Sequence, residues 1–205
     1  MRPAALLLMS LLGAGMAQTA RAESPQDAVF AARVIGKPAG KGAASACFVR
    51  AYAADHLAQH PRQNVRQMRM LVTTRVEEDG NRGYELRLHA QFRASGQIYE
   101  TQGSCGSLHA EGDASDPSAQ AHCGVDCDGG AIDVALRGDN SILVSIPEGA
   151  RLWRAGSNGD DETAPSAGHG FGADDKVFRL DRAGMSQCLS MAGNAKDRKS
   201  LGLGR

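Results

Sequence analysis

The stretch HCGVDCDGG, residues 122–130, gathers two cysteines, two aspartates and three glycines, residue types that can hold a metal or carry redox chemistry. A calcium loop places oxygen ligands at alternate positions and closes with a glutamate at about the twelfth position. Counted from Asp126, Asp128 fits this pattern, but Gly130 and Arg137 occupy the places of a ligand and of the closing glutamate. The stretch is therefore not an EF-hand loop.

Zinc and redox chemistry fit the same stretch no better. Cys123 and Cys127 lack the second close Cys/His pair that would complete a zinc site. Their C-x-x-x-C spacing also differs from the C-x-x-C of redox motifs. We therefore interpret CDGGA (127–131) as a glycine-permitted turn into the next strand, with nearby cysteines in structural disulfides. A looser contact of Asp126 and Asp128 with a cation or polar ligand stays open.

His56 and His60 form a second candidate metal site, because a four-residue spacing places two imidazoles on one helix face. In a zinc protease of the H-E-x-x-H type a glutamate follows the first histidine, whereas this chain has Leu57. Asp55 is a plausible helix cap, and Pro61 ends the helix after a turn or so. We expect both histidines to bond nearby groups and fix the start of the following strand, with metal binding as the alternative.

Other catalytic patterns do not occur in the sequence. It contains no G-x-S-x-G, no Walker motif and no dinucleotide-binding glycine pattern. The acidic runs EED (77–79) and GDDE (159–162) lie in polar stretches where solvated carboxylates are expected. We therefore assign no catalytic residue and expect no cofactor.

Two short stretches, HLAQHPRQNV (56–65) and CGVDCDGG (123–130), resemble signatures of uncharacterised exported proteins of proteobacteria that carry signal peptides. The resemblance implies an exported bacterial protein of unknown role. It supplies no catalytic or binding residues.

The N-terminus has the order of features that a signal peptide shows. Arg2 precedes the apolar run AALLLMSLLGAGMA, and Ala20-Arg21-Ala22 has the small-x-small form of a cleavage site. We expect cleavage near Ala22 and a periplasmic or secreted protein. No cysteine that could take a lipid anchor follows before Cys47, and no later stretch reaches the roughly 20 apolar residues of a membrane helix.

An oxidising compartment favours disulfides over free thiols. The five cysteines leave at least one unpaired within the chain, and about 15 two-bridge patterns are open. Because three of them bracket one loop, we expect at least one bridge among Cys105, Cys123 and Cys127; the other two cysteines are Cys47 and Cys188. A Cys105–Cys123 bridge would close a loop of about 19 residues.

The chain has no excess charge that would attract nucleic acid. It carries 23 basic and 23 acidic side chains, and removing a leader that contains two arginines leaves a formal charge of −2. Such a balance gives no long-range attraction to nucleic acid or to an anionic membrane.

Period-two alternation of apolar and polar residues predicts an antiparallel hairpin formed by 66–77 and 83–94. The sequence EEDGNRG between the two runs is typical of a turn. We expect Leu86, Leu88 and Phe92 to face the core.

Further strands are predicted in IYETQG, AIDVALR, SILVSIP, ARLWR and KVFRLDR, which brings the total to about seven or eight. A mainly antiparallel sheet of this size protects its edges as a sandwich or a barrel, and we favour a small β-barrel. A small barrel can also hold a small apolar ligand in its interior.

We expect one antiparallel β domain over residues 47–190, with a polar loop at 155–175 and a disordered basic tail at 191–205. Residues 23–46 are ambiguous. Ser24, Pro25 and Gly36 are typical of a helix start and stop, but VFAARVI fits a strand equally well, and GKPAGKGAASA has the composition of a flexible linker.

These observations favour an exported, non-catalytic β domain that binds a small ligand or an envelope component. The alternatives are a metal-dependent protein or enzyme that uses His56 and His60, or the loop of Asp126 and Asp128, and a purely structural protein.

Overall fold

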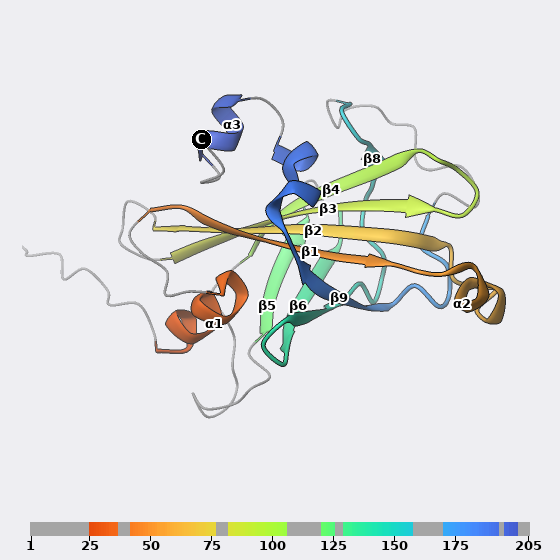
Figure 1. Ribbon diagram of the computed structural model, residues 1–205, viewed down its shortest axis with the longest axis horizontal. Helices are drawn as coiled ribbons and strands as arrows, with labels where there is room; N and C mark the ends of the chain where they lie inside the picture. Colours follow the sequence, from red (N-terminus) through yellow and green to blue (C-terminus); the bar gives the residue numbers. More distant parts are fainter. Residues whose placement is uncertain are drawn as a thin grey trace, which may run out of the picture.

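The computed structural model describes residues 25–36, 42–76, 82–105, 120–125, 129–157, 170–192 and 195–200. Its nine strands form one antiparallel sheet, and eight of them close into a barrel (Figure 1). The predicted barrel is therefore confirmed. The strands are β1 (Ala44–Ala51), β2 (Val65–Val76), β3 (Arg82–Phe92), β4 (Ile98–Cys105), β5 (Gln120–Val125), β6 (Ala131–Arg137), β7 (Ser141–Ser145), β8 (Trp153–Arg154) and β9 (Val177–Ala183).

The described helices are short and lie outside the sheet. They are α1 (Pro25–Ile35), α2 (Ala54–Gln59), the 3-10 turns η1 (Met185–Gln187) and η2 (Leu189–Ala192), and α3 (Ala195–Ser200). None of them is long and apolar enough to cross a bilayer.

Barrel closure depends on β4, whose two edges pair with three different strands. One edge pairs with β3 along its whole length; the other pairs first with β8 and then, from Gly103 to Cys105, with β5. A Cβ atom at Gly103 would lie 2.5 Å from the carbonyl oxygen of Gly124. Only glycine therefore permits β5 to approach β4 this closely.

The interior of the barrel is filled by side chains. Leu86, Leu88 and Phe92 have exposed fractions of 0%, as the alternating pattern of the hairpin predicts. One buried cluster joins residues from all eight barrel strands with residues from α1. The expected interior space for a small apolar ligand is thus occupied by the protein's own core.

Helix α1 packs against one end of this core, so the helical alternative for the segment that runs from Ser24 to Gly36 is correct for Pro25–Ile35. Phe30 and Val34 are buried, and the Phe30 ring meets the Tyr84 ring edge to face at 5.4 Å. The guanidinium of Arg182 donates to the carbonyl oxygens of Arg33 (2.7 Å) and Val34 (2.9 Å). It thereby satisfies acceptors that the last turn of a helix leaves open.

Residues 170–175, the described end of the polar loop predicted for 155–175, take part in the core, whereas residues 158–169 lie outside the described residues. Phe171 packs against Phe92, with ring centroids 6.0 Å apart, and Asp175 is fully buried. The Asp175 carboxylate accepts hydrogen bonds from the backbone N–H groups of Asn64 (2.7 Å), Val65 (3.2 Å) and Gly172 (2.8 Å). These backbone donors satisfy a buried carboxylate that composition alone assigned to solvent.

The chain after β9 folds back over the outer face of β1 and β2, as Figure 1 shows. A disulfide joins Cys47 to Cys188, and Leu71, Met191 and Ala192 pack beside it as a second buried cluster. The prediction of a disordered tail at 191–205 is therefore wrong for Met191 and Ala192 and for the helical residues of α3.

Two strands were missed by the sequence analysis. Residues 44–46, assigned to a flexible linker, begin β1, and residues 120–125, for which no strand was predicted, form β5. Both strands place small side chains inward, such as Ala46 in β1 and Ala121 in β5. Their alternation is therefore low in contrast, and pairing with neighbouring strands, not local propensity, makes them strands.

Candidate functional site

A row of polar and aromatic side chains crosses four strands on the outer face of the barrel. Register pairs Arg69 of β2 with His89 of β3, His89 with Glu100 of β4, and Glu100 with Trp153 of β8. Residues that face one another across a sheet point to the same side, with Cβ atoms about 5 Å apart. The fold therefore brings together four residues that lie up to 84 positions apart in the sequence.

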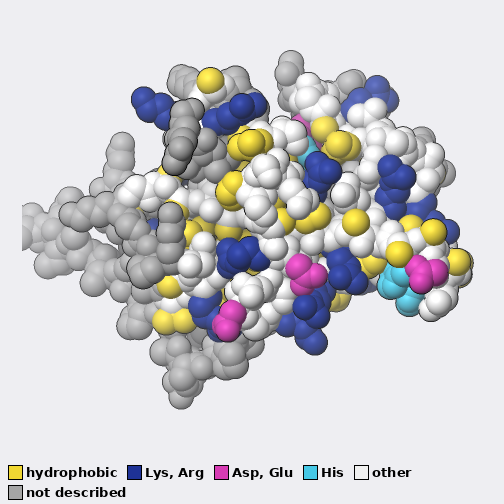
Figure 2. Space-filling model, viewed as in Figure 1, with side chains coloured by type: hydrophobic (Ala, Val, Ile, Leu, Met, Phe, Trp, Pro, Cys, Tyr) yellow, Lys and Arg dark blue, Asp and Glu magenta, His cyan; other side chains and the backbone are white. Residues whose placement is uncertain are grey.

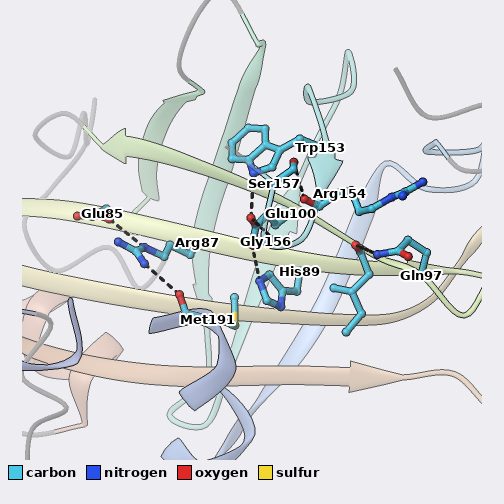
Figure 3. Close-up of polar contacts among 11 residues, drawn as sticks. Glu85, Arg87, His89, Gln97, Glu100, Trp153, Arg154, Gly156, Ser157 and Met191 are labelled. Carbon is cyan, nitrogen blue, oxygen red and sulfur yellow. Dashed lines mark hydrogen bonds and ion pairs between the residues drawn. The ribbon is translucent and has the colours of Figure 1, made fainter. Parts of the chain in front are cut away.

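Glu100 is held at both carboxylate oxygens. Its Oε2 lies 3.0 Å from Nε2 of His89, while Oε1 accepts hydrogen bonds from Nε1 of Trp153 (3.0 Å) and the backbone N–H of Gly156 (3.1 Å). Figure 3 shows the three donors converging on this carboxylate. The short strand β8 and the turn after it thus fix the orientation of Glu100.

These contacts determine the charge of Glu100. Burial alone would raise its pKa, but the hydrogen bonds from His89, Gly156 and Trp153 outweigh that effect, so the pKa of Glu100 lies below its usual value. Glu100 is therefore ionised at neutral pH and can only accept hydrogen bonds. It follows that Nε2 of His89 carries the hydrogen that it donates to Glu100.

The Nδ1 atom of His89 is buried and has no hydrogen-bond partner within the described part of the chain. The same holds for Nε of Arg69, a donor from the adjacent strand. The His89 side chain is only 8% exposed, so it is largely desolvated. A third such atom is the hydroxyl oxygen of Thr101. Thr101 points to the barrel interior and not to this outer face, because its register partner, Leu88, is a core residue.

Arg69 and His89 line one shallow depression on the outer face. The depression is open to solvent, the space it encloses is about 10 Å³, and its remaining lining residues are Gln67, Ala90, Gln91 and Ile98. A space of this size is about that of one water molecule, whereas pockets for drug-sized ligands usually span about 300–1,000 Å³. This depression therefore does not enclose a ligand, and a group bound at it would lie largely in solvent.

Arg69 lacks a carboxylate partner in the described residues. Its only hydrogen bond there runs from Nη2 to Oε1 of Gln67, at 3.3 Å. By contrast Arg75, on the same face of β2, pairs with Glu85 at 3.3 Å. The depression thus contains one guanidinium whose charge no neighbouring side chain neutralises.

An imidazole backed by a carboxylate is also a common arrangement in general acid–base catalysis. Such catalysis usually acts on a hydroxyl, thiol or water held next to the free imidazole nitrogen. The six residues that line the depression include neither a hydroxyl nor a thiol. Guanidinium, imidazole and amide groups together are better suited to hydrogen-bonding a ligand than to attacking one.

The two histidines of the HLAQH stretch are arranged as a stack. The rings of Tyr52 and His56 lie 4.8 Å apart, and those of His56 and His60 lie 4.4 Å apart. Nε2 of His56 is 3.0 Å from Oε1 of Gln63, whose amide nitrogen donates to the carbonyl oxygen of Val65 at the start of β2. This geometry fits the expected role of fixing the beginning of the strand.

The predicted helix cap at Asp55 is wrong. The residue before α2 is Ala53, which makes no side-chain capping bond, and Asp55 lies within the first turn of the helix. The other end is held instead by Arg93, whose Nη1 donates to the carbonyl oxygens of Leu57 (3.1 Å) and His60 (3.2 Å).

The CGVDCDGG stretch is described only in part. Asp126, Cys127 and Asp128 lie outside the described residues. Cys123 forms a disulfide with Cys105, which confirms the expected bridge in this region. Within the described ranges, no group of three or more His, Cys, Asp or Glu side chains is placed to hold a metal ion.

A second histidine–carboxylate pair joins β5 and β6 on another part of the outer face. Nδ1 of His122 lies 2.6 Å from Oδ1 of Asp133, and the His122 side chain is 65% exposed. Because water surrounds this pair, it creates no desolvated polar atom. It therefore serves as an exposed counterpart of the buried pair formed by His89 and Glu100.

The sequence analysis did not identify Arg69, His89, Glu100 or Trp153 as site residues. In the predicted hairpin, Arg69 and His89 fall on the polar face, where side chains are ordinarily solvated. The hairpin register would have placed these two side by side, but their burial also depends on β4, the next strand, and on β8, which pairs with β4 from a distant part of the chain.

Comparison of the chain with protein-family models, with curated proteins and with solved structures finds no match.

Proposed function

We propose that this chain is an exported, non-catalytic binding protein that recognises a small ligand or an envelope component through the depression at Arg69 and His89. The observation that carries the proposal is that two residues lining one open depression, Arg69 and His89, each hold a buried polar atom, Nε and Nδ1, without a partner among the described residues. A buried donor or acceptor without a partner costs about 1–3 kcal/mol. A ligand that supplies both partners would recover that free energy.

The filled interior supports a binding site on the outside. A ligand inside the barrel would have to displace fully buried side chains such as Phe48, Leu88 and Phe178. Displacing close-packed core residues is strongly unfavourable. The outer depression requires no such rearrangement.

Export is supported by the signal-peptide pattern of the first 22 residues and by the two disulfides. Disulfides persist in oxidising compartments and are rare in the cytosol of mesophiles. A mature protein starting at Glu23 would retain all five cysteines and the whole described structure.

The export part of the proposal is tested by expressing the full chain in a Gram-negative host and fractionating the cells. We expect the protein in the periplasm or medium, and N-terminal sequencing should begin at or near Glu23. An uncleaved chain retained in the cytosol would contradict it.

Binding is tested by nuclear magnetic resonance on isotope-labelled mature protein, with a small-molecule extract of the periplasm as the probe. When the extract binds, we expect the Arg69 Nε–H signal and the His89 ring signals to shift. In the Arg69→Gln variant, the His89 signals should no longer shift. Arg75→Gln is the matched control, because Arg75 shares the strand and face of Arg69 but already has Glu85 as its partner. If neither the extract nor defined ligands move these signals, the proposed binding site is wrong.

A further inference from the structure

We propose that residues 184–192 form a strap that borders the depression, and that reduction of the Cys47–Cys188 disulfide by a dithiol releases this strap. Release opens the way to Arg69 and His89, an inference that rests on the binding function proposed above and describes its regulation. The strap follows β9 directly and consists mainly of the turns η1 and η2. Figure 1 shows it crossing the outer face of the sheet.

The strap covers residues that adjoin Arg69 on the outer face. Val49 of β1 pairs with Arg69 in register, and Leu71 follows Arg69 by two positions on the same side of β2. Leu71 belongs to the buried cluster that contains Met191 and Ala192 of the strap, and Val49 packs against that cluster. On this side of Arg69 the strap therefore takes the place of solvent.

The strap also contacts the strand that carries His89. Arg87, two positions before His89 on the same side of β3, donates from Nη1 to the carbonyl oxygen of Met191 at 3.0 Å. Figure 3 shows this contact together with His89. On the opposite side, β8 pairs with the strand that carries Glu100. Arg69 and His89 thus lie between the strap and β8, in keeping with the burial of their unpartnered nitrogen atoms.

The strap can separate from the barrel without disturbing the main core. The cluster beneath the strap lies on the outer face and shares none of its described residues with the core that fills the interior. By contrast, the Cys105–Cys123 disulfide joins β4 to β5, and Cys123 is part of the main core. Loss of the Cys47–Cys188 disulfide therefore affects a local unit, whereas loss of the other disulfide affects the barrel wall.

The contact between the strap and the barrel is mainly apolar. Met191 and Ala192 pack with Leu71, and Val49 and Met185 lie at the margin of this cluster. Figure 2 shows hydrophobic side chains at the surface along the course of the strap. Opening of the strap therefore leaves few polar groups without partners, which keeps the free-energy cost of opening low. The disulfide is then the bond that keeps the strap closed.

Opening of the strap precedes reduction, because Cys47 is only 1% exposed and Cys188 is 0% exposed. The turns η1 and η2 are short 3-10 helices, whose hydrogen bonds have poorer geometry than those of an α-helix. Gln187 and Ser190, which lie close to Cys188 in the strap, are exposed. Segments with few buried contacts open at low cost in free energy. Local opening thus brings the Cys188 sulfur to solvent.

Reduction is a thiol–disulfide exchange in two steps. A thiolate of the dithiol attacks the Cys188 sulfur, and Cys47 leaves as a thiolate that takes up a proton. The second thiolate of the dithiol then attacks its partner sulfur in the mixed disulfide, and Cys188 leaves and takes up a proton. The protein disulfide gains two electrons and two protons, and the dithiol that loses them becomes a disulfide. Because the strap stays joined to Ala183, which pairs with Cys47, oxidation can close it again.

The test begins with two matched double variants of the mature protein, studied without ligand. Cys47→Ser with Cys188→Ser removes the proposed control, and Cys105→Ser with Cys123→Ser removes the other bridge. Amide hydrogen exchange of the strap should be at least about tenfold faster in the first variant than in wild type, which corresponds to about 1.4 kcal/mol less for opening. It should be unchanged in the second variant. Circular dichroism would show that the barrel is retained.

Acylation of histidine rings by diethyl pyrocarbonate measures access to the site. In oxidised wild type, His122 is 65% exposed and should react rapidly, whereas His89 is 8% exposed and should react slowly. Loss of the Cys47–Cys188 disulfide should raise the rate at His89 by about tenfold or more and leave His122 unchanged. Wild type reduced with dithiothreitol, with the freed Cys47 and Cys188 identified by alkylation, should behave in the same way and replaces the variant if that variant does not fold.

Strap exchange or His89 reactivity that is unaffected by loss of the Cys47–Cys188 disulfide would overturn this inference. The periplasmic extract separates it from the binding function, since we expect the released form to bind the extract more tightly than the oxidised form. If the extract binds both forms equally, the binding function stands and its regulation by the strap fails. If the strap opens and His89 becomes reactive while the extract shifts no signal in either form, the release of the strap stands and the binding function fails.

Discussion

Individual residues on the outer face of this barrel differ in how far their neighbours desolvate them. His89 and His122 each face a carboxylate across a strand pair, but their side chains are 8% and 65% exposed. Among the described residues, the buried pair leaves a desolvated nitrogen, Nδ1 of His89, without a partner. The same two residue types therefore have different polar environments at the two places, because their burial differs.

Replacement of Glu100 by glutamine should make stability less dependent on acid pH. The pKa of Glu100 is lowered in the folded protein, so its contribution is present above its ordinary value of 4.5 and is lost as pH falls through the folded value. At neutral pH, the free energy of unfolding of the wild type should exceed that of Glu100→Gln by about 1–3 kcal/mol. Denaturant unfolding should show this difference shrinking as the pH is lowered to about 3.

The exposed pair provides the control for this measurement. Asp133→Asn should change stability by less than about 0.5 kcal/mol. An acid profile of Glu100→Gln that parallels the wild type would show that the carboxylate is not stabilised by its three donors.

Asp175 should show the opposite pH dependence. Burial is the largest influence and raises its pKa, although the N–H groups of Gly172, Asn64 and Val65 partly oppose the shift. A raised folded pKa means that its contribution is largest below the ordinary value of 3.8 and is lost as pH rises through the folded value. The stability difference between wild type and Asp175→Asn should therefore shift in favour of the variant as pH rises, as urea titrations at several pH values would reveal. A difference that moves the other way would contradict this.

At the scale of single elements, the central hairpin supplies much of the core. Leu88 is fully buried on β3, and we expect Leu88→Ala to lower the free energy of unfolding by about 2–5 kcal/mol. Val76→Ala is the control, since Val76 on β2 is 37% exposed and should lose less than about 1 kcal/mol. Similar losses in urea unfolding for both variants would mean that Leu88 is not a core residue.

Helix α1 ends at a position that requires glycine. Gly36 has φ of +80°, and a Cβ there would lie 3.4 Å from the guanidinium carbon of Arg182. Gly36→Ala should therefore lower stability by about 1–2 kcal/mol, from the left-handed backbone alone. Gly138→Ala is informative beside it, because Gly138 has φ of +65° but open space around it. A larger loss at Gly36 in thermal unfolding would show the added crowding of Arg182; equal losses would show that the backbone conformation alone matters.

At the scale of the whole molecule, closure joins segments that are distant in the chain. Strand β9 lies between β1 and β7, and the Cys47–Cys188 disulfide spans 141 positions. Bringing such distant segments together lowers the entropy of the chain, more than the closing of a short local contact does. The disulfides offset part of that cost by restricting the unfolded chain.

Thiol titration of unreduced, denatured protein should find one thiol per chain, since two disulfides use four of the five cysteines. The Cys105–Cys123 bridge should contribute about 3 kcal/mol in the chain-entropy model, so a paired Cys105→Ser and Cys123→Ser variant should unfold at correspondingly lower urea. Five reactive thiols would contradict both bridges and the oxidising compartment.

The sequence by itself determined those features that depend on neighbours along the chain. The alternation in YELRLHAQFR predicts β3 and its buried face, and the turn before it predicts the hairpin with β2. Three clustered cysteines predicted a local bridge, which Cys105 and Cys123 form. The choice of a barrel followed from several short antiparallel strands whose edges need partners.

Only the tertiary structure decided what depends on residues far apart in the sequence. Ala46 belongs to a strand because β2 and β9 pair with β1, not because of its own propensity. Asp175 is buried because the backbone of Asn64 and Val65 receives it. His89 lies on the polar face of its strand yet is desolvated, because burial is a property of the assembled sheet. Its partner Glu100 comes from the next strand, and Trp153, from a distant part of the chain, in turn holds Glu100.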